Sequence, residues 1–201
     1  MRRQDVLGEV AVTTPEELTS IVAQAHTAQA EWWQIGLEQR KAHLVKFLET
    51  LKQYREELTT LPTREMGAPL SLTGAFIPRS EKTLQWNLDN ADNALANEVL
   101  YEDDKEINEL VYEPYGVVAV IVAWNFPYPN FIQSVTQPLL AGNTVVMKYS
   151  EEIPMFSKLM EKIVAESGLP KGVVSFVYGD GKIGAASVSY THLTLPTKRI
   201  V

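Results

Sequence analysis

Three short segments contain the residues whose types and spacing could do chemistry: Trp124-Asn125-Phe126-Pro127, Lys148-Tyr149-Ser150-Glu151 and Gly179-Asp180-Gly181-Lys182-Ile183-Gly184. They offer an amide, an ammonium and a carboxylate for binding polar groups, and glycines that let a backbone approach a nucleotide closely. Each segment also has a purely structural interpretation. Asn125 could cap a following helix, Lys148 could end a strand in a solvated turn, and the glycines could simply reverse the chain.

The composition excludes several other kinds of chemistry. The chain of 201 residues has no cysteine, which excludes a disulfide, a thiolate metal site and a cysteine nucleophile within it. The three histidines, His26, His43 and His192, are too scattered to predict a metal cluster. A net charge of −7 argues against a general affinity for nucleic acid. No stretch approaches the roughly 18 apolar residues of a membrane span, and the first residues lack the apolar run of a secretory signal. We therefore expect a cytoplasmic protein with neither nucleic acid nor membrane as a partner.

The elements that must position the three segments are helical in the first half of the chain. The segment Thr14-Pro15-Glu16-Glu17 has the capping box and the first-turn proline of a helix start. A second helix is predicted after Gly36, and Pro62 is expected to kink or break its continuation, since proline has no amide hydrogen. A third helix is predicted over about 79–95, with Pro78 at its start.

The second half of the chain alternates between strands and helices. Two short extended pieces within about 97–113 predict a β-hairpin. Three apolar runs follow, Val117–Ala123, Thr144–Met147 and Val173–Val177, separated by segments long enough for helices. This alternation predicts a parallel sheet with crossover helices. Ligands bind beyond the carboxyl ends of such strands, where the asparagine and lysine segments lie.

The same segments carry a family resemblance. Glu113-Pro114-Tyr115-Gly116-Val117-Val118, leading into Trp124–Pro127 and then Gly142-Asn143-Thr144-Val145-Val146, resembles the aldehyde dehydrogenase superfamily from about residue 8 to about residue 186. The resemblance implies an α/β fold in which N-terminal helices and a β-hairpin lead into a partial Rossmann-like parallel sheet. Residues 1–187 would then form a partial NAD-binding domain, with the hairpin at about 97–113 mediating homo-oligomers.

The resemblance also implies roles for individual residues. The Asn125 amide would donate a hydrogen bond to the aldehyde oxygen as it becomes negative, and the neighbours of Asn125 favour this catalytic role over a helix cap. Lys148 and Glu151 would bind the adenosine ribose, and a carboxylate there repels a 2′-phosphate, which favours NAD over NADP. The family pattern has proline where Tyr149 stands. The expected cofactor-binding residues are Ile121, Trp124, Lys148, Glu151, Gly179 and Gly181, with no metal.

The implied activity is the oxidation of an aldehyde to a carboxylic acid with NAD, or with NADP as the alternative. The family uses a cysteine nucleophile and a general-base glutamate, neither of which can be assigned here. We therefore expect an inactive fragment that lacks the catalytic domain. Two alternatives remain open: a reductase or acylating member of the superfamily, and a cysteine-free nucleotide-binding or structural remnant. The aldehyde itself is not indicated, because Trp86, Tyr128 and Phe131 could border a substrate tunnel or simply pack in the core.

The end of the chain departs from this pattern. Residues 188–201 read like the translation of a transposase adapter used in DNA sequencing libraries, and we expect them to be a foreign tail. The alternative is a natural terminus that ends in an extended segment.

Overall fold

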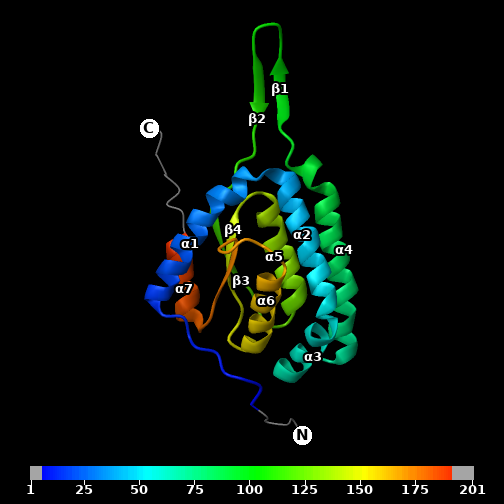
Figure 1. The fold of residues 1–201 in the computed structure, drawn as a ribbon, viewed down its shortest axis with the longest axis vertical. Helices are drawn as coiled ribbons and strands as arrows, with labels where there is room; N and C mark the ends of the chain where they lie inside the picture. The colour runs from blue at the N-terminus through cyan, green and yellow to red at the C-terminus, as the bar shows by residue number, and fades with distance from the viewer. Residues whose placement is uncertain (1–5, 192–201) are drawn as a thin grey trace.

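A computed structural model describes residues 6–191 as a three-stranded sheet with helices on both faces (Figure 1). The helices α1 (Pro15–Gln34) and α7 (Gly181–Thr191) lie against one face of the sheet. The other face is covered by α5 (Pro127–Leu140) and α6 (Pro154–Glu166). Outside these two helices lie α2 (Gly36–Gln53), α3 (Arg55–Met66) and α4 (Leu70–Ala94). The expected α/β class is confirmed.

Local sequence signals place the first helix correctly. The Thr14 hydroxyl accepts a hydrogen bond from the Glu17 amide at 3.2 Å, and the Glu17 carboxylate accepts one from the Thr14 amide at 2.8 Å. This reciprocal pair is the predicted capping box. The second helix also begins at Gly36, as predicted.

The two predicted proline boundaries are wrong. Pro62 lies inside α3 and Pro78 lies inside α4, whereas the chain leaves helical geometry at Tyr54 and at Gly67, whose φ is 74°. A proline in a helix interior costs about 3 kcal/mol. Burial of large apolar side chains offsets that cost by about 1.5–3 kcal/mol each, and Ile77, beside Pro78, is buried. Tertiary packing therefore overrides the local signal of both prolines.

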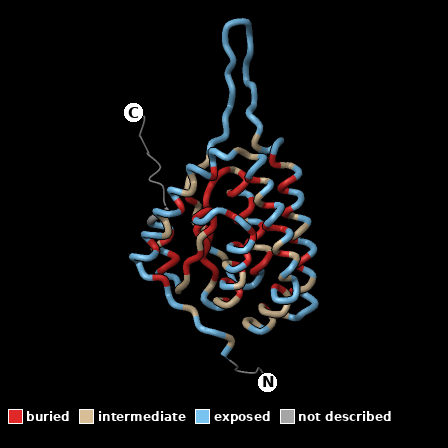
Figure 2. Tube along the Cα trace, in the orientation of Figure 1, coloured by how far each residue is buried: buried red, intermediate tan, exposed pale blue. Residues whose placement is uncertain are grey.

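The predicted hairpin projects away from the rest of the molecule (Figure 1). Its strands β1 (Glu98–Glu102) and β2 (Ile107–Leu110) pair antiparallel within the predicted range. The Asp103 carboxylate closes the turn by accepting from the amides of Lys105 and Glu106 at 2.8 and 2.9 Å. Every residue of both strands is exposed (Figure 2). The hairpin therefore adds no side chain to the core.

The sheet is parallel, as predicted, with the strand order β3 (Val117–Ile121), β4 (Thr144–Lys148) and β5 (Val174–Val177). All five residues of the central strand are buried, which explains why this strand is a continuous apolar run ending in a lysine. Helix α5 connects β3 to β4, and α6 connects β4 to β5.

Hydrogen bonds join helix α1 to the end of α5 and to the turn that follows it. The Trp32 indole donates to the Leu139 carbonyl at 2.9 Å, and the Gln29 amide donates to the Gly142 carbonyl at 3.1 Å. Gly142 has a φ of 85°, and a Cβ there would lie 2.3 Å from Cε3 of Trp33. Only glycine fits this close approach, so residue 142 sets how tightly α1 packs.

The three aromatic residues considered for a substrate tunnel separate into two groups. Tyr128 and Phe131 lie in the core, whereas Trp86 is 63% exposed on α4. The core interpretation therefore holds for the first two.

Candidate functional site

The strands β3 and β4 end side by side, and this places the first predicted site residues together. Ile121 is the register partner of Lys148, and the Val122 amide donates to the Lys148 carbonyl at 3.1 Å. The two chemical segments that follow these strands therefore leave the same edge of the sheet.

Lys148 is buried at that edge, with only 3% of its surface exposed. Its ammonium donates to the Tyr149 carbonyl at 3.2 Å and lies 3.6 Å from the half-exposed Glu151 carboxylate. A buried ammonium needs such partners, because desolvation without them is costly. The interpretation of Lys148 as part of a solvated turn is therefore wrong for its side chain.

The glycine segment brings α7 close to Lys148. The Asp180 carboxylate accepts from the Lys182 amide at 2.8 Å, at the start of the helix. A Cβ at Gly184 would lie 3.6 Å from Cδ of Lys148 and 3.8 Å from Cδ1 of Ile121. These are ordinary van der Waals distances, so residue 184 lies directly beside both side chains. Gly181 faces open space, since a Cβ there would meet no atom within 4 Å.

Gly179 has a conformation that suits glycine. Its φ is 143°, and a Cβ there would lie 2.6 Å from Cγ1 of Ile183 and 3.1 Å from Cγ1 of Val12. A side chain at this position would collide with Ile183 and crowd Val12, so the turn after β5 favours glycine for packing as well as for its backbone angle.

A pocket of about 190 Å³ joins Glu151 to Gly179. Its walls come from the loop after β4, the start of α6, the end of β5 and the N-terminal segment; they are Val10, Val12, Tyr149, Ser150, Glu151, Pro154, Ser157, Tyr178 and Gly179. The N-terminal segment is held there because the Thr13 amide donates to the Tyr178 carbonyl, while the Thr13 hydroxyl accepts from the Tyr178 amide, both at 2.9 Å. The pocket thus contains two of the predicted cofactor residues.

Sequence reasoning missed the contribution of Val10, Val12 and Tyr178 to this pocket. Burial and a hydrogen bond to Glu161 raise the pKa of the Tyr178 hydroxyl above its ordinary value, so this wall of the pocket stays neutral. No local pattern could have found these residues, because the contact between Thr13 and Tyr178 spans 165 positions.

Trp124 and Asn125 lie in the exposed turn between β3 and α5. The residue that precedes the helix is Phe126, and α5 has no side-chain cap, so Asn125 does not cap it. The Asn125 amide makes no hydrogen bond to any residue that the structure describes. Phe126 packs against Phe76 of α4, with ring centroids 5.2 Å apart. This turn therefore presents a free amide beside an aromatic surface.

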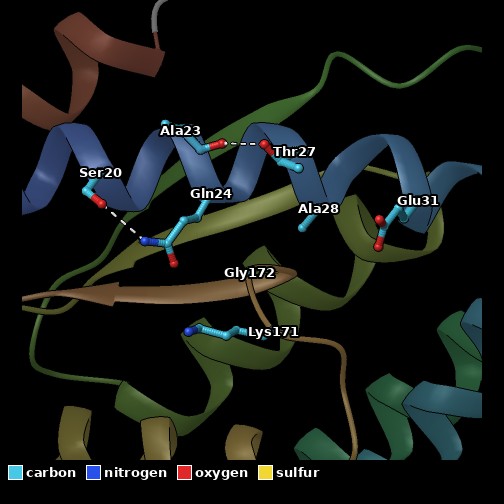
Figure 3. A pocket seen from close by; sticks show the side chains of 8 residues that line it. All are labelled: Ser20, Ala23, Gln24, Thr27, Ala28, Glu31, Lys171 and Gly172. Atoms are coloured by element: carbon cyan, nitrogen blue, oxygen red, sulfur yellow. Dashed lines mark hydrogen bonds between the residues drawn. The ribbon is translucent and has the colours of Figure 1, made fainter.

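A larger hollow of about 510 Å³ lies elsewhere, between α1 and the residues before β5 (Figure 3). Within α1, Gln24 donates to the Ser20 hydroxyl at 3.1 Å and Thr27 donates to the Ala23 carbonyl at 3.1 Å. None of the predicted site residues lines it. The hollow is therefore separate from the pocket that contains Glu151 and Gly179.

Residues 6–191 contain neither a metal-binding cluster nor a membrane-spanning helix. That part of the chain holds no cluster of three or more acidic, histidine or cysteine side chains able to bind a metal. It also contains no helix with the length and apolar character needed to cross a bilayer.

The sequence pattern of the aldehyde dehydrogenase family matches residues 2–194, so the chain belongs to this family. It is 32% identical over 191 residues to N-succinylglutamate 5-semialdehyde dehydrogenase 1 of Caulobacter vibrioides, covering 94% of this chain and 40% of that protein. It is 28% identical over 196 residues to 1-pyrroline-5-carboxylate dehydrogenase 2 of Bacillus subtilis, covering 97% and 38%. The chain thus spans less than half the length of these relatives.

Solved structures show the same fold. PnpE in complex with nicotinamide adenine dinucleotide superimposes with a TM-score of 0.86 at 30% identity, over 93% of this chain and 39% of that one. An NAD-dependent benzaldehyde dehydrogenase from Corynebacterium glutamicum superimposes with a TM-score of 0.85 at 27% identity, over 94% and 42%. The expected partial Rossmann-like cofactor-domain fold is confirmed.

The family match extends further than the sequence resemblance suggested. It ends at residue 194 rather than near 186, and α7 continues to Thr191. The expected foreign tail at 188–201 therefore begins inside this helix, and its residues 192–201 lie outside the described part of the chain. The origin of the tail stays a prediction.

Proposed function

We propose that this chain is the cofactor-binding part of an enzyme that oxidises an aldehyde to a carboxylic acid with NAD. Residues 1–187 would form the partial NAD-binding domain, and the catalytic domain would be supplied by sequence that this chain does not contain. Family membership supports the reaction class, and the names of the two curated relatives describe aldehyde or related dehydrogenases. The complex of PnpE with NAD supports the cofactor.

The observation that carries the proposal is the convergence of Lys148, Glu151 and Gly179 at one edge of the sheet. In the proposed complex, the Lys148 ammonium donates to a ribose hydroxyl, and the Glu151 carboxylate accepts from the ribose 2′ and 3′ hydroxyls. That carboxylate repels a 2′-phosphate, so NAD is preferred to NADP. Ile121, Trp124 and Gly181 complete the proposed cofactor-binding set.

Asn125 is the proposed catalytic residue of this chain. An unpaired, exposed amide can donate to the aldehyde oxygen as negative charge develops on it, which lowers the barrier by a few kcal/mol. When bound, NAD supplies the hydride acceptor. The nucleophile must come from elsewhere, because this chain has no cysteine. We therefore propose that the chain alone does not oxidise aldehydes.

The projecting hairpin is the proposed oligomer contact. A two-stranded ribbon is marginally stable by itself in water. Its strands nevertheless expose Leu100 and Ile107 to 68% and 59%. Apolar exposure of this kind on a projecting element marks an interaction surface, and we assign it to further copies of the same protein.

The NAD proposal is tested by measuring binding of NAD and NADP to the purified 201-residue chain by calorimetry. We expect tighter binding of NAD, and we expect Glu151→Gln to narrow the preference about fivefold, the equivalent of removing a repulsion of about 1 kcal/mol. Glu152→Gln is the matched control, because Glu152 is an adjacent exposed acid that does not line the pocket. Failure to bind NAD, or an equal effect of both variants, would contradict the proposed site.

A cysteine-free remnant is the competing function, and it would bind NAD in the same way. Sequencing the gene through the Ser187 codon from an adapter-free template separates the two. A reading frame that continues to a cysteine supports the enzyme. A gene that encodes residues 188–201 and then stops supports the remnant. NADH formation by the purified chain with an aldehyde would contradict the proposed inactivity.

A further inference from the structure

Tyr149 connects the two halves of the candidate site. It follows Lys148 directly, and only 3% of its surface is exposed. Its hydroxyl donates to the carbonyl of Pro127, the first residue of α5, at 3.0 Å. That residue also ends the segment that contains Asn125. One buried hydrogen bond therefore joins the loop after β4 to the turn after β3.

The backbone and the side chain of Tyr149 serve different partners. Its carbonyl accepts from the Lys148 ammonium at 3.2 Å, while its hydroxyl faces α5. Its ring packs edge-on against Phe156 of α6, with centroids 5.6 Å apart and an interplanar angle of 80°. A shift of the loop around Lys148 would therefore also displace the first residues of α5 and α6.

The far end of the same loop is fixed independently. The Glu65 carboxylate, from the last turn of α3, accepts from the amides of Met155 and Phe156 at 2.7 and 2.9 Å. The start of α6 is thereby held, and the loop between Lys148 and this point has both of its ends anchored. Tyr149 is the anchor that leads to Asn125.

We propose that Tyr149 is a positioning residue that couples the Lys148–Glu151 loop to the Asn125 turn. The assignment of roles to the two segments rests on the proposed function, whereas the physical link does not. The coupling fixes the Asn125 turn relative to the proposed ribose-binding groups.

The test compares Tyr149→Phe with Tyr128→Phe by amide hydrogen exchange in the full chain without ligand. Both changes remove one buried hydroxyl. The Tyr128 hydroxyl has no hydrogen-bond partner among the described residues and lies in α5 itself, so it controls for the substitution. We expect Tyr149→Phe to speed exchange of the amides within residues 124–131, apart from Pro127 and Pro129, which have none, about fivefold to tenfold, as loss of a buried hydrogen bond allows. In α1 and β5, the amides of the Tyr149→Phe variant should exchange at the same rates as those of the Tyr128→Phe variant.

Two results would overturn the coupling. One is the same exchange of residues 124–131 in both variants, which would mean that the hydroxyl fixes nothing. The other is a uniform increase over α1, β5 and this segment, which would indicate general destabilisation rather than positioning.

A second measurement repeats the exchange with NAD. We expect NAD to slow exchange of residues 124–131 in the original chain, and Tyr149→Phe to reduce that protection at equal occupancy. An original chain that does not bind NAD contradicts the proposed function, yet the ligand-free comparison still decides whether the link exists. Equal protection in both proteins at equal occupancy would contradict the coupling alone.

Discussion

Burial is the main cause that raises the pKa of the hydroxyls of Tyr128, Tyr149 and Tyr178. The unfolded chain releases these protons near the ordinary tyrosine pKa of about 10. Because the folded pKa is higher, the folded state holds the protons more tightly. The stabilisation is therefore complete below about pH 10 and is lost as the pH rises toward the folded pKa.

Tyr149→Phe should make the chain less sensitive to alkali. Each buried phenol removes up to about 1.4 kcal/mol of folding free energy per pH unit above its unfolded pKa, and the variant lacks one of them. Urea unfolding between pH 8 and pH 11 checks this, as the free energy should fall less steeply for the variant. Tyr115→Phe, at an exposed position, should retain the original slope. If the free energy of unfolding fell equally steeply with pH in the original chain and in both variants, the burial of the Tyr149 phenol would not be the cause of the alkaline destabilisation.

At the residue scale, the sequence indicated the position of Lys148 and the need for glycine at residue 179, because strand ends and glycine spacings are local signals. It held no sign that Tyr149 bonds to Pro127 or that Tyr178 forms a wall of the pocket. These contacts join separate elements, so they depend on the packing of the whole sheet. The chemical roles of Asn125 and of the cofactor-binding residues stay predictions.

At the scale of elements, Glu65 substitutes for a cap that α6 does not have. The residue before this helix, Ile153, makes no side-chain cap, and the Glu65 carboxylate accepts from two of its first amides instead. Burial raises the pKa of this carboxyl, and the two amides oppose that shift. An acid from α3 therefore completes the start of α6.

Glu65→Ala should lower the free energy of unfolding by about 1–3 kcal/mol, since it leaves two amide donors without a partner. Glu56→Ala is the control, because Glu56 lies on the same helix and is exposed. Chemical denaturation followed by circular dichroism compares them. Similar losses in the two variants would show that the cap contributes little.

The accuracy of the sequence predictions differed between elements for a physical reason. The capping box before α1 and the apolar run of β4 are local and agree with the fold. Pro62 and Pro78 are local signals that the packing of α3 and α4 overrides. The predicted helix boundaries were therefore wrong where packing against a neighbouring element contributed more free energy than the local preference of proline.

At the scale of the whole molecule, the hairpin is separate from the body that it projects from (Figure 2). Replacing residues 98–110 with a short glycine-serine turn should abolish self-association and leave the helical signal unchanged, because both strands are exposed. Light scattering after size exclusion measures the mass. Leu100→Lys with Ile107→Lys should act in the same direction, whereas Glu102→Gln with Glu109→Gln is the control that changes the net charge by the same amount. An unchanged mass after the replacement would exclude the hairpin as the contact.

The hydrogen bonds that hold α1 in place can form only after residues far along the chain have been synthesised. The hydrogen bonds from Trp32 to Leu139, from Gln29 to Gly142 and from Thr144 to Ala25 span 107, 113 and 119 positions. A ribosome adds roughly 5–20 residues each second, so on the order of 5–20 s separate the synthesis of α1 from that of its partner. During this interval the apolar side chains of the first helix have no core to enter. In the nascent chain, α1 is therefore available to a chaperone until its partner residues have been synthesised.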